Sequence, residues 1–245
     1  MKKILYLFGA SLLMLTSCSN DEDSDSPDTA YLVKEIAYVE GSYSFSSKIT
    51  YNGNKIVSSV DSDGEKTLYT YTGDLITKEE EFAVGNNIDS KIEYSYDNNQ
   101  LKTSVSTEIS GSVTYKSKNV YTHNSDGTVS CKTYNINLTT GAETLSYSGK
   151  YTFLNGNMVK REQGTDYVLV FEYDTKNNPI KNILGFDKLM ETEFSANNII
   201  KITSTNNGSS PSISTNQYDY NTAGYPTEQR SFYNGGISGV TKFTY

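Results

Sequence analysis

The chain has little of what usually carries enzyme chemistry. It contains one His, two Cys, four Pro and no Trp among 245 residues. A single His leaves a His-based catalytic triad, or a zinc site built on several His ligands, without support. Two Cys cannot form the disulfide framework of a small secreted domain. The sequence also has no long stretch with helical periodicity, so it predicts one continuous β domain.

Basic residues are also in the minority. Lys and Arg number 21 against 29 Asp and Glu, which gives a formal net charge of −8. Phosphate contacts dominate the affinity of nucleic-acid-binding proteins, and an acidic chain makes few of them. The balance therefore predicts no nucleic-acid partner. It agrees with solubility at a crowded surface or with weak cation binding.

Tyrosine, in contrast, is abundant at 21 residues, and most of these tyrosines belong to one recurring pattern. Each copy has aromatic residues at alternate positions, then a turn rich in Asn, Asp or Gly, then an aliphatic residue. The copies recur every roughly 20 to 30 residues, a period typical of arrays of small supersecondary units. They are Tyr51–Ile56, Tyr69–Leu75, Tyr94–Leu101, Tyr121–Val129, Tyr151–Met158, Phe171–Ile180, Phe194–Ile199 and Tyr218–Tyr225, with a half copy at Phe243–Tyr245.

The pattern predicts β-hairpins. Alternation places both aromatic residues of a copy on one face of a strand, and Asn and Gly tolerate the positive φ of tight hairpin turns. After the turn of the Tyr94 copy, alternation places Leu101, Thr103 and Val105 on one face. We expect an all-β, antiparallel meander of about 18 strands, curled into a flattened barrel or a rolled sheet. The two halves would face each other about 10 Å apart, with Tyr and Phe between them.

The repeats resemble the YD repeats of Rhs-type proteins, whose units follow Tyr-x-Tyr-Asp-x-x-Gly-x-Leu. Tyr94–Leu101 and Tyr218–Tyr225 match best, and the resemblance covers most of residues 45–245. Individual copies replace the Gly by Asn, or the Asp by Asn or Thr. No cargo or autoproteolytic core is present, so the shell role of Rhs proteins does not carry over. In overall organisation the chain also resembles small surface lipoproteins of unknown function from Bacteroidota, some of which have a porin-like β fold.

The first 17 residues have the pattern of a lipoprotein signal peptide. Lys2 and Lys3 precede the apolar run Ile4–Leu15, which is too short for a permanent transmembrane helix. Leu15-Thr16-Ser17-Cys18 resembles a bacterial lipobox, which implies lipidation of Cys18. An ordinary secretory signal with a chance Cys is the alternative. Acyl chains on Cys18 would anchor the protein in a membrane.

An acidic segment follows, and residues 18–30 are predicted to form a disordered tether before the β domain at 31–245. Asp21, Glu22, Asp23 and Asp25 resemble the surface-export signal of Bacteroidota lipoproteins. The alternative is a solvated spacer in the periplasm. The resemblance favours an outer-membrane lipoprotein exposed at the cell surface.

The remaining chemistry-bearing residues have structural explanations. His123 occupies the second aromatic slot of its repeat, which predicts a packed ring, and Cys131 suits a buried apolar position, although a Cys-His dyad is conceivable. Glu79–Glu81 is interpreted as solvated charge. Asp61–Glu65 is interpreted as a turn rather than a weak calcium site, because it lacks the EF-hand spacing. The sequence predicts no catalytic, cofactor-binding or metal-binding residue.

The function classes that remain are therefore mainly non-enzymatic. We expect a lipid-anchored protein that binds a glycan or protein ligand, or a structural module of the envelope. A hydrolase of glycosides that uses two carboxylates is one alternative. A transmembrane β-barrel with a polar lumen is the other. The apolar face of the strands is rich in Tyr and Thr rather than Leu and Val, which disfavours the transmembrane barrel.

Overall fold

The structure is a computed structural model that describes residues 31–245. The predicted signal peptide, the lipidation site Cys18 and the acidic run Asp21–Asp25 lie outside the described residues. Among residues 31–245, no helix is long and apolar enough to cross a membrane.

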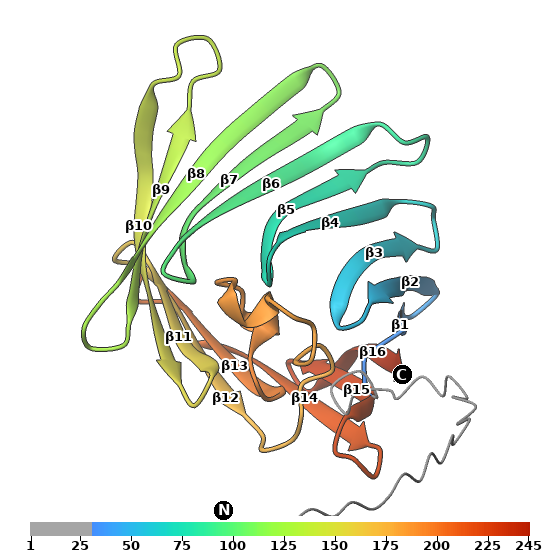
Figure 1. The fold of residues 1–245 in the computed structure, drawn as a ribbon. Coiled ribbons are helices and arrows are strands. Elements are labelled where there is room, and N and C mark those ends of the chain that lie inside the picture. Colours follow the sequence, from blue (N-terminus) through green and yellow to red (C-terminus); the bar gives the residue numbers. More distant parts are fainter. Residues whose placement is uncertain (1–30) are drawn as a thin grey trace, which may run out of the picture.

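Sixteen antiparallel strands form a closed barrel, in which each strand pairs with its sequence neighbours and β1 pairs with β16 (Figure 1). This confirms the predicted all-β meander, and the sheet is a closed barrel rather than an open roll. The strands are β1 (Glu35–Glu40), β2 (Tyr43–Asn52), β3 (Lys55–Asp61), β4 (Lys66–Thr72), β5 (Leu75–Phe82), β6 (Ile88–Asp97), β7 (Gln100–Ser110), β8 (Val113–His123), β9 (Val129–Ile136), β10 (Glu143–Leu154), β11 (Asn157–Gln163), β12 (Tyr167–Tyr173), β13 (Ile199–Asn206), β14 (Ser212–Tyr220), β15 (Pro226–Tyr233) and β16 (Gly236–Thr244).

The barrel has two strands fewer than predicted because one repeat does not form a hairpin in the wall. Residues 174–198, here called the plug, leave β12 and enter the barrel before β13 begins. The plug contains two short 3₁₀ helices, η1 (Phe186–Lys188) and η2 (Thr192–Phe194).

The sequence of the plug explains this departure from the strand pattern. Ile183, Phe186 and Leu189 are spaced three residues apart, and all three are buried. The backbone N–H of each donates to the carbonyl three residues earlier, at 3.0, 3.4 and 3.0 Å respectively. A 3₁₀ turn aligns residues i and i+3 on one side. The period of three therefore builds an apolar ridge where the hairpin prediction required a period of two.

The plug lies across the barrel at the rim formed by the short turns, here called the plug end (Figure 1). Its backbone bonds to three of those turns: Leu184 N–H to Asn54 O at 2.9 Å, Ala196 N–H to Gly156 O at 3.1 Å and Asn177 N–H to Gly224 O at 3.0 Å. Its apolar ridge packs on wall residues that directly follow the turns, among them Ile56 and Ile76. The opposite rim, formed by the β5–β6, β7–β8 and β9–β10 hairpins, is here called the open end.

A β-bulge recurs at the same place in most repeats. Tyr71 pairs with Ile76, whereas its neighbour Thr70 pairs with Lys78, so one extra residue stands opposite the β4 strand. The same shift occurs at Tyr51, Tyr96 and Phe153. The aromatic residue and the aliphatic residue paired with it both point inward, and the extra residue reverses the alternation of the second strand beyond that pair.

The bulge overturns one prediction about strand faces. Leu101 pairs with Tyr96 and points inward, but Thr103 pairs with Ser95 on the outer face. Val105 follows Thr103 outward, and Ser104 is the buried neighbour. The prediction that Leu101, Thr103 and Val105 share one face is therefore wrong. It assumed unbroken alternation after the turn.

The repeat tyrosines point into the barrel, as the sequence predicts. Their hydroxyls donate to backbone carbonyls inside it: Tyr51 to Val33 O at 2.7 Å, Tyr96 to Ile76 O at 2.6 Å and Tyr71 to Leu184 O at 2.9 Å. Burial raises the pKa of these hydroxyls, that of Tyr71 to about 12. The rings pack against the plug instead of against a facing wall about 10 Å away, so the flattened arrangement is not needed.

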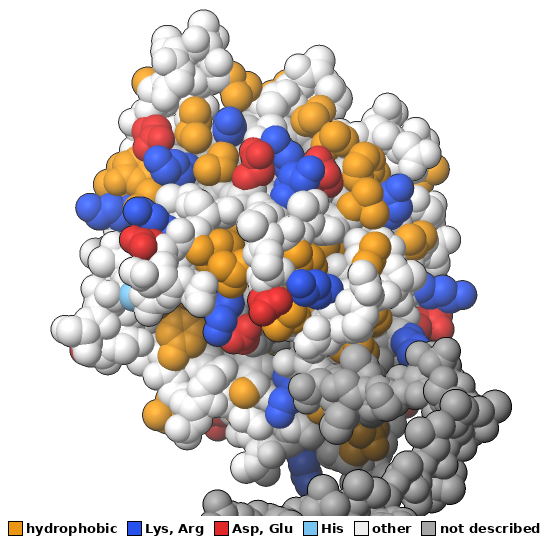
Figure 2. Space-filling view, viewed as in Figure 1, with side chains coloured by type: hydrophobic (Ala, Val, Ile, Leu, Met, Phe, Trp, Pro, Cys, Tyr) orange, Lys and Arg blue, Asp and Glu red, His pale blue; other side chains and the backbone are white. Residues whose placement is uncertain are grey.

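The outer wall is charged. Ion pairs join Lys78 to Glu80 at 2.8 Å and Lys91 to Glu93 at 2.9 Å on outward positions of β5 and β6. Lys160 and Glu162 form another such pair on β11 at 2.8 Å. Basic and acidic side chains are scattered over the whole visible face of the barrel, with apolar side chains between them (Figure 2). The outer wall thus has no continuous apolar belt on this face.

Gly185 is a position where the plug requires glycine. Its φ is +86°, and a Cβ placed there would lie 3.0 Å from Asp74 O in the β4–β5 turn. Gly185→Ala should destabilise the protein by about 1–3 kcal/mol, because both the backbone and the turn are strained. Gly208→Ala is the control, with φ +71° and open space around the Cβ. Urea unfolding measures both variants, and equal losses would contradict the close approach at Gly185.

Candidate functional site in the lumen

The inner wall toward the open end is polar. Cross-strand pairing places five inward side chains side by side on β7, β8 and β9: Ser106 opposite Ser117, Ser117 opposite Asn135, and Glu108 opposite Tyr115. These positions lie beyond the ring of repeat tyrosines, where the sequence changes from aromatic to hydroxyl, amide and carboxyl side chains. The barrel therefore has an aromatic, plugged half and a hydrophilic half.

Two cavities overlap on this wall. One has a volume of about 710 Å³ and is lined by residues of β5 to β8, and the other has about 460 Å³ and is lined by residues of β7 to β9. Ser106, Glu108 and Tyr115 line both. We call the combined cavity the lumenal groove. Its volume is in the range of pockets that hold small ligands.

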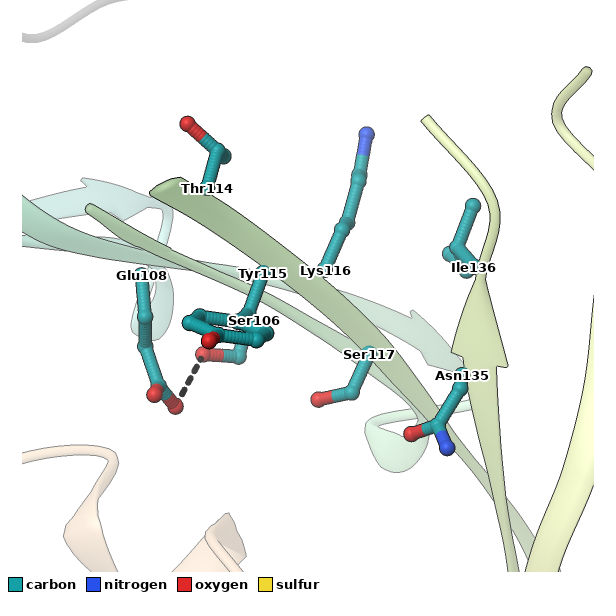
Figure 3. Close-up of a pocket in the computed structure, with 8 residues that line it drawn as sticks. All are labelled: Ser106, Glu108, Thr114, Tyr115, Lys116, Ser117, Asn135 and Ile136. Atoms are coloured by element: carbon teal, nitrogen blue, oxygen red, sulfur yellow. Dashed lines mark hydrogen bonds between the residues drawn. The ribbon is translucent and has the colours of Figure 1, made fainter. Parts of the chain in front are cut away.

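Tyr115 is the main aromatic surface of the groove. Its side chain is 61 % exposed although it points into the barrel. Figure 3 shows the ring beside Ser106 and Glu108, on the side of the sheet from which Ser117 and Asn135 also extend. Thr114, Lys116 and Ile136 extend from the opposite side. The ring is therefore offered to the lumen and not to the outer surface.

Tyr115 is not among the residues for which the sequence predicts a role. It lies outside the repeats, near the tip of the β7–β8 hairpin, and nothing in its local pattern distinguishes it from other surface tyrosines. Its position opposite Glu108 could have indicated a site, but that position follows from the strand register, which the sequence alone does not give.

Glu79 is not the solvated surface charge that the sequence predicts. It points inward from β5, is partly buried and accepts a hydrogen bond of 3.0 Å from the Tyr94 hydroxyl. Burial is the main cause that raises the pKa of Glu79 to about 7; the hydrogen bond from Tyr94 opposes this rise, and the charges of Glu81 and Glu191 add to it. Glu80, between them, points outward to Lys78, so the run alternates between the two faces as expected for a strand.

Glu191 lies on the plug and is exposed to solvent. The surrounding walls nevertheless raise the pKa of Glu191 by desolvation, while Arg161 on β11 lowers it. Arg161 itself stands 5.7 Å above the Tyr151 ring. The charge of Glu191 also reaches Glu79 and raises its pKa.

The Asp61–Glu65 stretch forms the predicted turn, between β3 and β4. Carboxylate oxygens of Asp61, Asp63 and Glu65 lie within 4.8 Å of one another. Burial raises the pKa of Asp61, and the charge of Asp63 raises that of Glu65. Exposed acidic clusters of this kind are common in proteins without a bound ion, so the cluster alone assigns no metal site.

His123 and Cys131 do not form a dyad. His123 is half-buried, with Nε2 2.9 Å from Leu101 O, and it pairs opposite Val129. Cys131 is buried opposite Tyr121, and burial raises the pKa of its thiol. Both residues occupy the packed positions that the sequence predicts for them.

No family model and no curated protein matches the chain. Among the solved structures that share its fold are two porin-like proteins from Bacteroides. A porin-like protein from Bacteroides vulgatus ATCC 8482 superposes with a TM-score of 0.60 at 14 % identity, over 88 % of this chain and 98 % of the other. A porin-like protein from Bacteroides uniformis ATCC 8492 gives a TM-score of 0.52 at 13 % identity, over 86 % of this chain and 97 % of the other. At these identities the likeness shows the fold alone.

Proposed function

We propose that the chain is a non-enzymatic, ligand-binding barrel of the outer membrane, held by lipid on Cys18 and displayed at the cell surface, with its outer wall in water. The observation that carries the proposal is a charged outer wall around a lumen that is plugged at one end and hollow at the other. The porin-like fold of the two Bacteroides proteins supports an outer-membrane location. A structural role in the envelope is the second candidate, because side chains on the outer wall can also contact a partner protein.

The outer wall argues against insertion in lipid. A Lys that faces lipid near the bilayer midplane of a membrane barrel costs about 2–4 kcal/mol. Lys78, Lys91 and Lys160 all face outward here, each beside a Glu on the same strand. In water such pairs are close to neutral for stability. The barrel is therefore suited to an aqueous environment, and a membrane attachment has to come from the predicted anchor.

The described chain begins at the plug end. The Tyr31 ring stacks on Tyr225 with centroids 4.9 Å apart, and Tyr225 follows the β14–β15 turn that bonds to the plug. An anchor at Cys18 would therefore hold the plug end toward the membrane. The open end, with the lumenal groove, would face away from the lipid and receive ligands from outside.

The plug disfavours a permeation role. Its ridge packs against Ile56 and Ile76 of the wall and against Leu32, which precedes β1, and its Met190 reaches the second core cluster around Leu101. A pore needs a continuous water-filled path. The arrangement instead resembles a cup, whose floor is the plug and whose polar wall can bind a ligand.

A hydrolase that uses two carboxylates is less well supported. A raised pKa, such as that of Glu79, suits a general acid. However, the carboxylates that line the lumenal groove are Glu81, Asp89 and Glu108, and Glu79 is not among them. It is engaged with Tyr94, deeper in the barrel. We therefore assign it a structural role.

Substitution of the anchor residue tests the proposal. Cys18→Ala should convert the protein from a membrane-bound to a soluble form, because the charged barrel has no other means of staying in lipid. The measurement is fractionation of cells, with a carbonate wash of the membranes. An integral barrel would remain in the washed membranes after the substitution, and that result would overturn the proposal.

Surface display has a separate test. Protease added to intact cells should cleave the wild-type barrel. Replacement of Asp21, Glu22, Asp23 and Asp25 by Ala should protect the protein from the protease while leaving it bound to the membrane. Cleavage of neither form would place the barrel in the periplasm.

A further inference from the structure

We propose that the lumenal groove binds a neutral carbohydrate, with Tyr115 as the platform on which a sugar ring lies. The inference rests on the proposed function, and it deepens that function by naming the class of ligand and the residues that contact it.

Tyr115 differs from the buried tyrosines of the barrel in how its hydroxyl is used. Buried tyrosines of this barrel use their hydroxyls for structure, as Tyr51 does with Val33 O and Tyr96 with Ile76 O. Among the described residues, no hydrogen-bond partner of the Tyr115 hydroxyl is found, and its ring is more than half exposed in the groove. A Tyr ring combines an apolar face with a polar tip. Tyr115 thus offers a free apolar face and a free polar tip inside a cavity.

Polar side chains lie around the Tyr115 ring. Ser117 and Asn135 stand next to each other on the inner wall, and neither side chain has a hydrogen-bond partner among the described residues. Ser106 donates to Glu108 only at 3.5 Å, a weak bond. Together these side chains provide hydroxyl, amide and carboxylate groups, which include both donors and acceptors. A polyhydroxylated ligand matches such a mixture, because each sugar hydroxyl donates and accepts.

The charge and polarity of the groove's lining determine which class of ligand it can bind. The larger cavity is lined by Glu81, Asp89 and Glu108, and no Lys or Arg lines it. An anionic ligand would be repelled there. Lys116 lines the smaller cavity, but it extends from the outer side of the sheet, away from Tyr115 (Figure 3). Ligand pockets for apolar molecules are mostly hydrophobic, unlike this one. Among uncharged ligands, polar molecules with an apolar ring face fit this lining, and a cation, which the carboxylates would attract, is the competing ligand in the test.

The test is a glycan array of neutral oligosaccharides probed with the full chain, followed by calorimetry with the strongest binder. Tyr115→Ala and Asn135→Ala should each weaken binding about ten-fold or more, as expected for central groups of a binding site. The control is Tyr43→Ala. Tyr43 is 59 % exposed and lies at the β1–β2 hairpin, away from the groove, so its loss should change the affinity by less than about two-fold.

Tyr115→Phe separates the ring from its hydroxyl and should retain most of the affinity. Thermal unfolding of each variant shows that it folds, as expected for exposed side chains. The proposal is overturned if no neutral oligosaccharide binds, if Tyr115→Ala has no larger effect than Tyr43→Ala, or if only a cationic probe such as spermine binds. Each of these results could occur while Cys18→Ala still releases the barrel from the membrane, so failure of this inference is distinguishable from failure of the proposed function.

Discussion

Phe186→Ala is expected to cost about 3–5 kcal/mol of unfolding free energy, the range for removal of a buried Phe. Phe186 is only 6 % exposed, at the centre of the plug. Its ring lies 4.3 Å from that of Phe194 within the plug and 6.0 Å from that of Tyr69 on β4. Truncation would leave a cavity between the plug and the wall. Urea denaturation of both proteins measures the loss.

Phe82→Ala is the matched control for Phe186→Ala. Phe82 points outward from β5, where Lys66 Nζ lies 5.0 Å from its ring centroid. Because no packed core surrounds it, its loss should cost no more than about 1.5 kcal/mol. Equal losses for the two variants would mean that the plug is not packed in the barrel, and would contradict the cup-shaped structure.

Glu79→Gln is expected to stabilise the barrel at pH 8 by about 2 kcal/mol. The pKa of Glu79 is raised from 4.5 to about 7, which corresponds to about 3 kcal/mol at full strength. The side chain is partly buried, so contact with solvent reduces this value. A carboxyl whose pKa is raised on folding contributes stability that is complete below pH 4.5 and is lost as the pH rises through 7. The amide stays neutral and can still accept from Tyr94.

The measurement is the unfolding free energy of wild type and variant between pH 4 and pH 8. The difference between them should grow across this interval, because only the wild type must keep a desolvated charge beside Glu81 and Glu191. Glu80→Gln is the control, since Glu80 faces outward and pairs with Lys78. A difference between wild type and Glu79→Gln that is independent of pH would show that Glu79 is solvated in the folded state.

Much of the fold follows from local sequence. Asn98 and Asn99 both adopt positive φ in the turn of the Tyr94 repeat, and Asn155-Gly156 and Asn234-Gly235 do the same in theirs. Such pairs strongly favour tight hairpin turns. The aromatic residues of each copy then decide which face points inward. The antiparallel meander and its tyrosine-rich interior are therefore predictable from the repeats, whereas closure of the barrel depends on the pairing of β1 with β16.

The plug was not predictable in the same way. Phe171–Ile180 and Phe194–Ile199 keep the repeat pattern, which suggested another hairpin. What differs is the connection, where Ile183, Phe186 and Leu189 follow a period of three, and where Gly185 allows close approach to a turn. Those residues gain burial only against distant wall residues. The choice between wall and plug is thus a tertiary one, which local alternation cannot reveal.

The bulges explain why the polar side of the lumen was also missed. Each bulge reverses the alternation, so inward positions beyond it cannot be assigned without the register. Ser104 and Ser106 are inward because of the bulge after Leu101. Tyr115 is inward because β8 pairs with β7. The candidate site depends on the strand register, whereas the core can be recognised from the aromatic and aliphatic residues of the repeats.

We propose that the outer wall of this barrel stands in water. It is tested most directly by placing a single reactive thiol at an outward position in the middle of the wall. Glu93→Cys is suitable, because Glu93 is half-exposed and its surface pair with Lys91 contributes little. Cys131 is buried and gives the background. In native membranes, a membrane-impermeant maleimide should label the introduced thiol as fast as it does in protein released by Cys18→Ala. Protection of the thiol until detergent is added would show that the wall is covered by lipid, and would contradict the account.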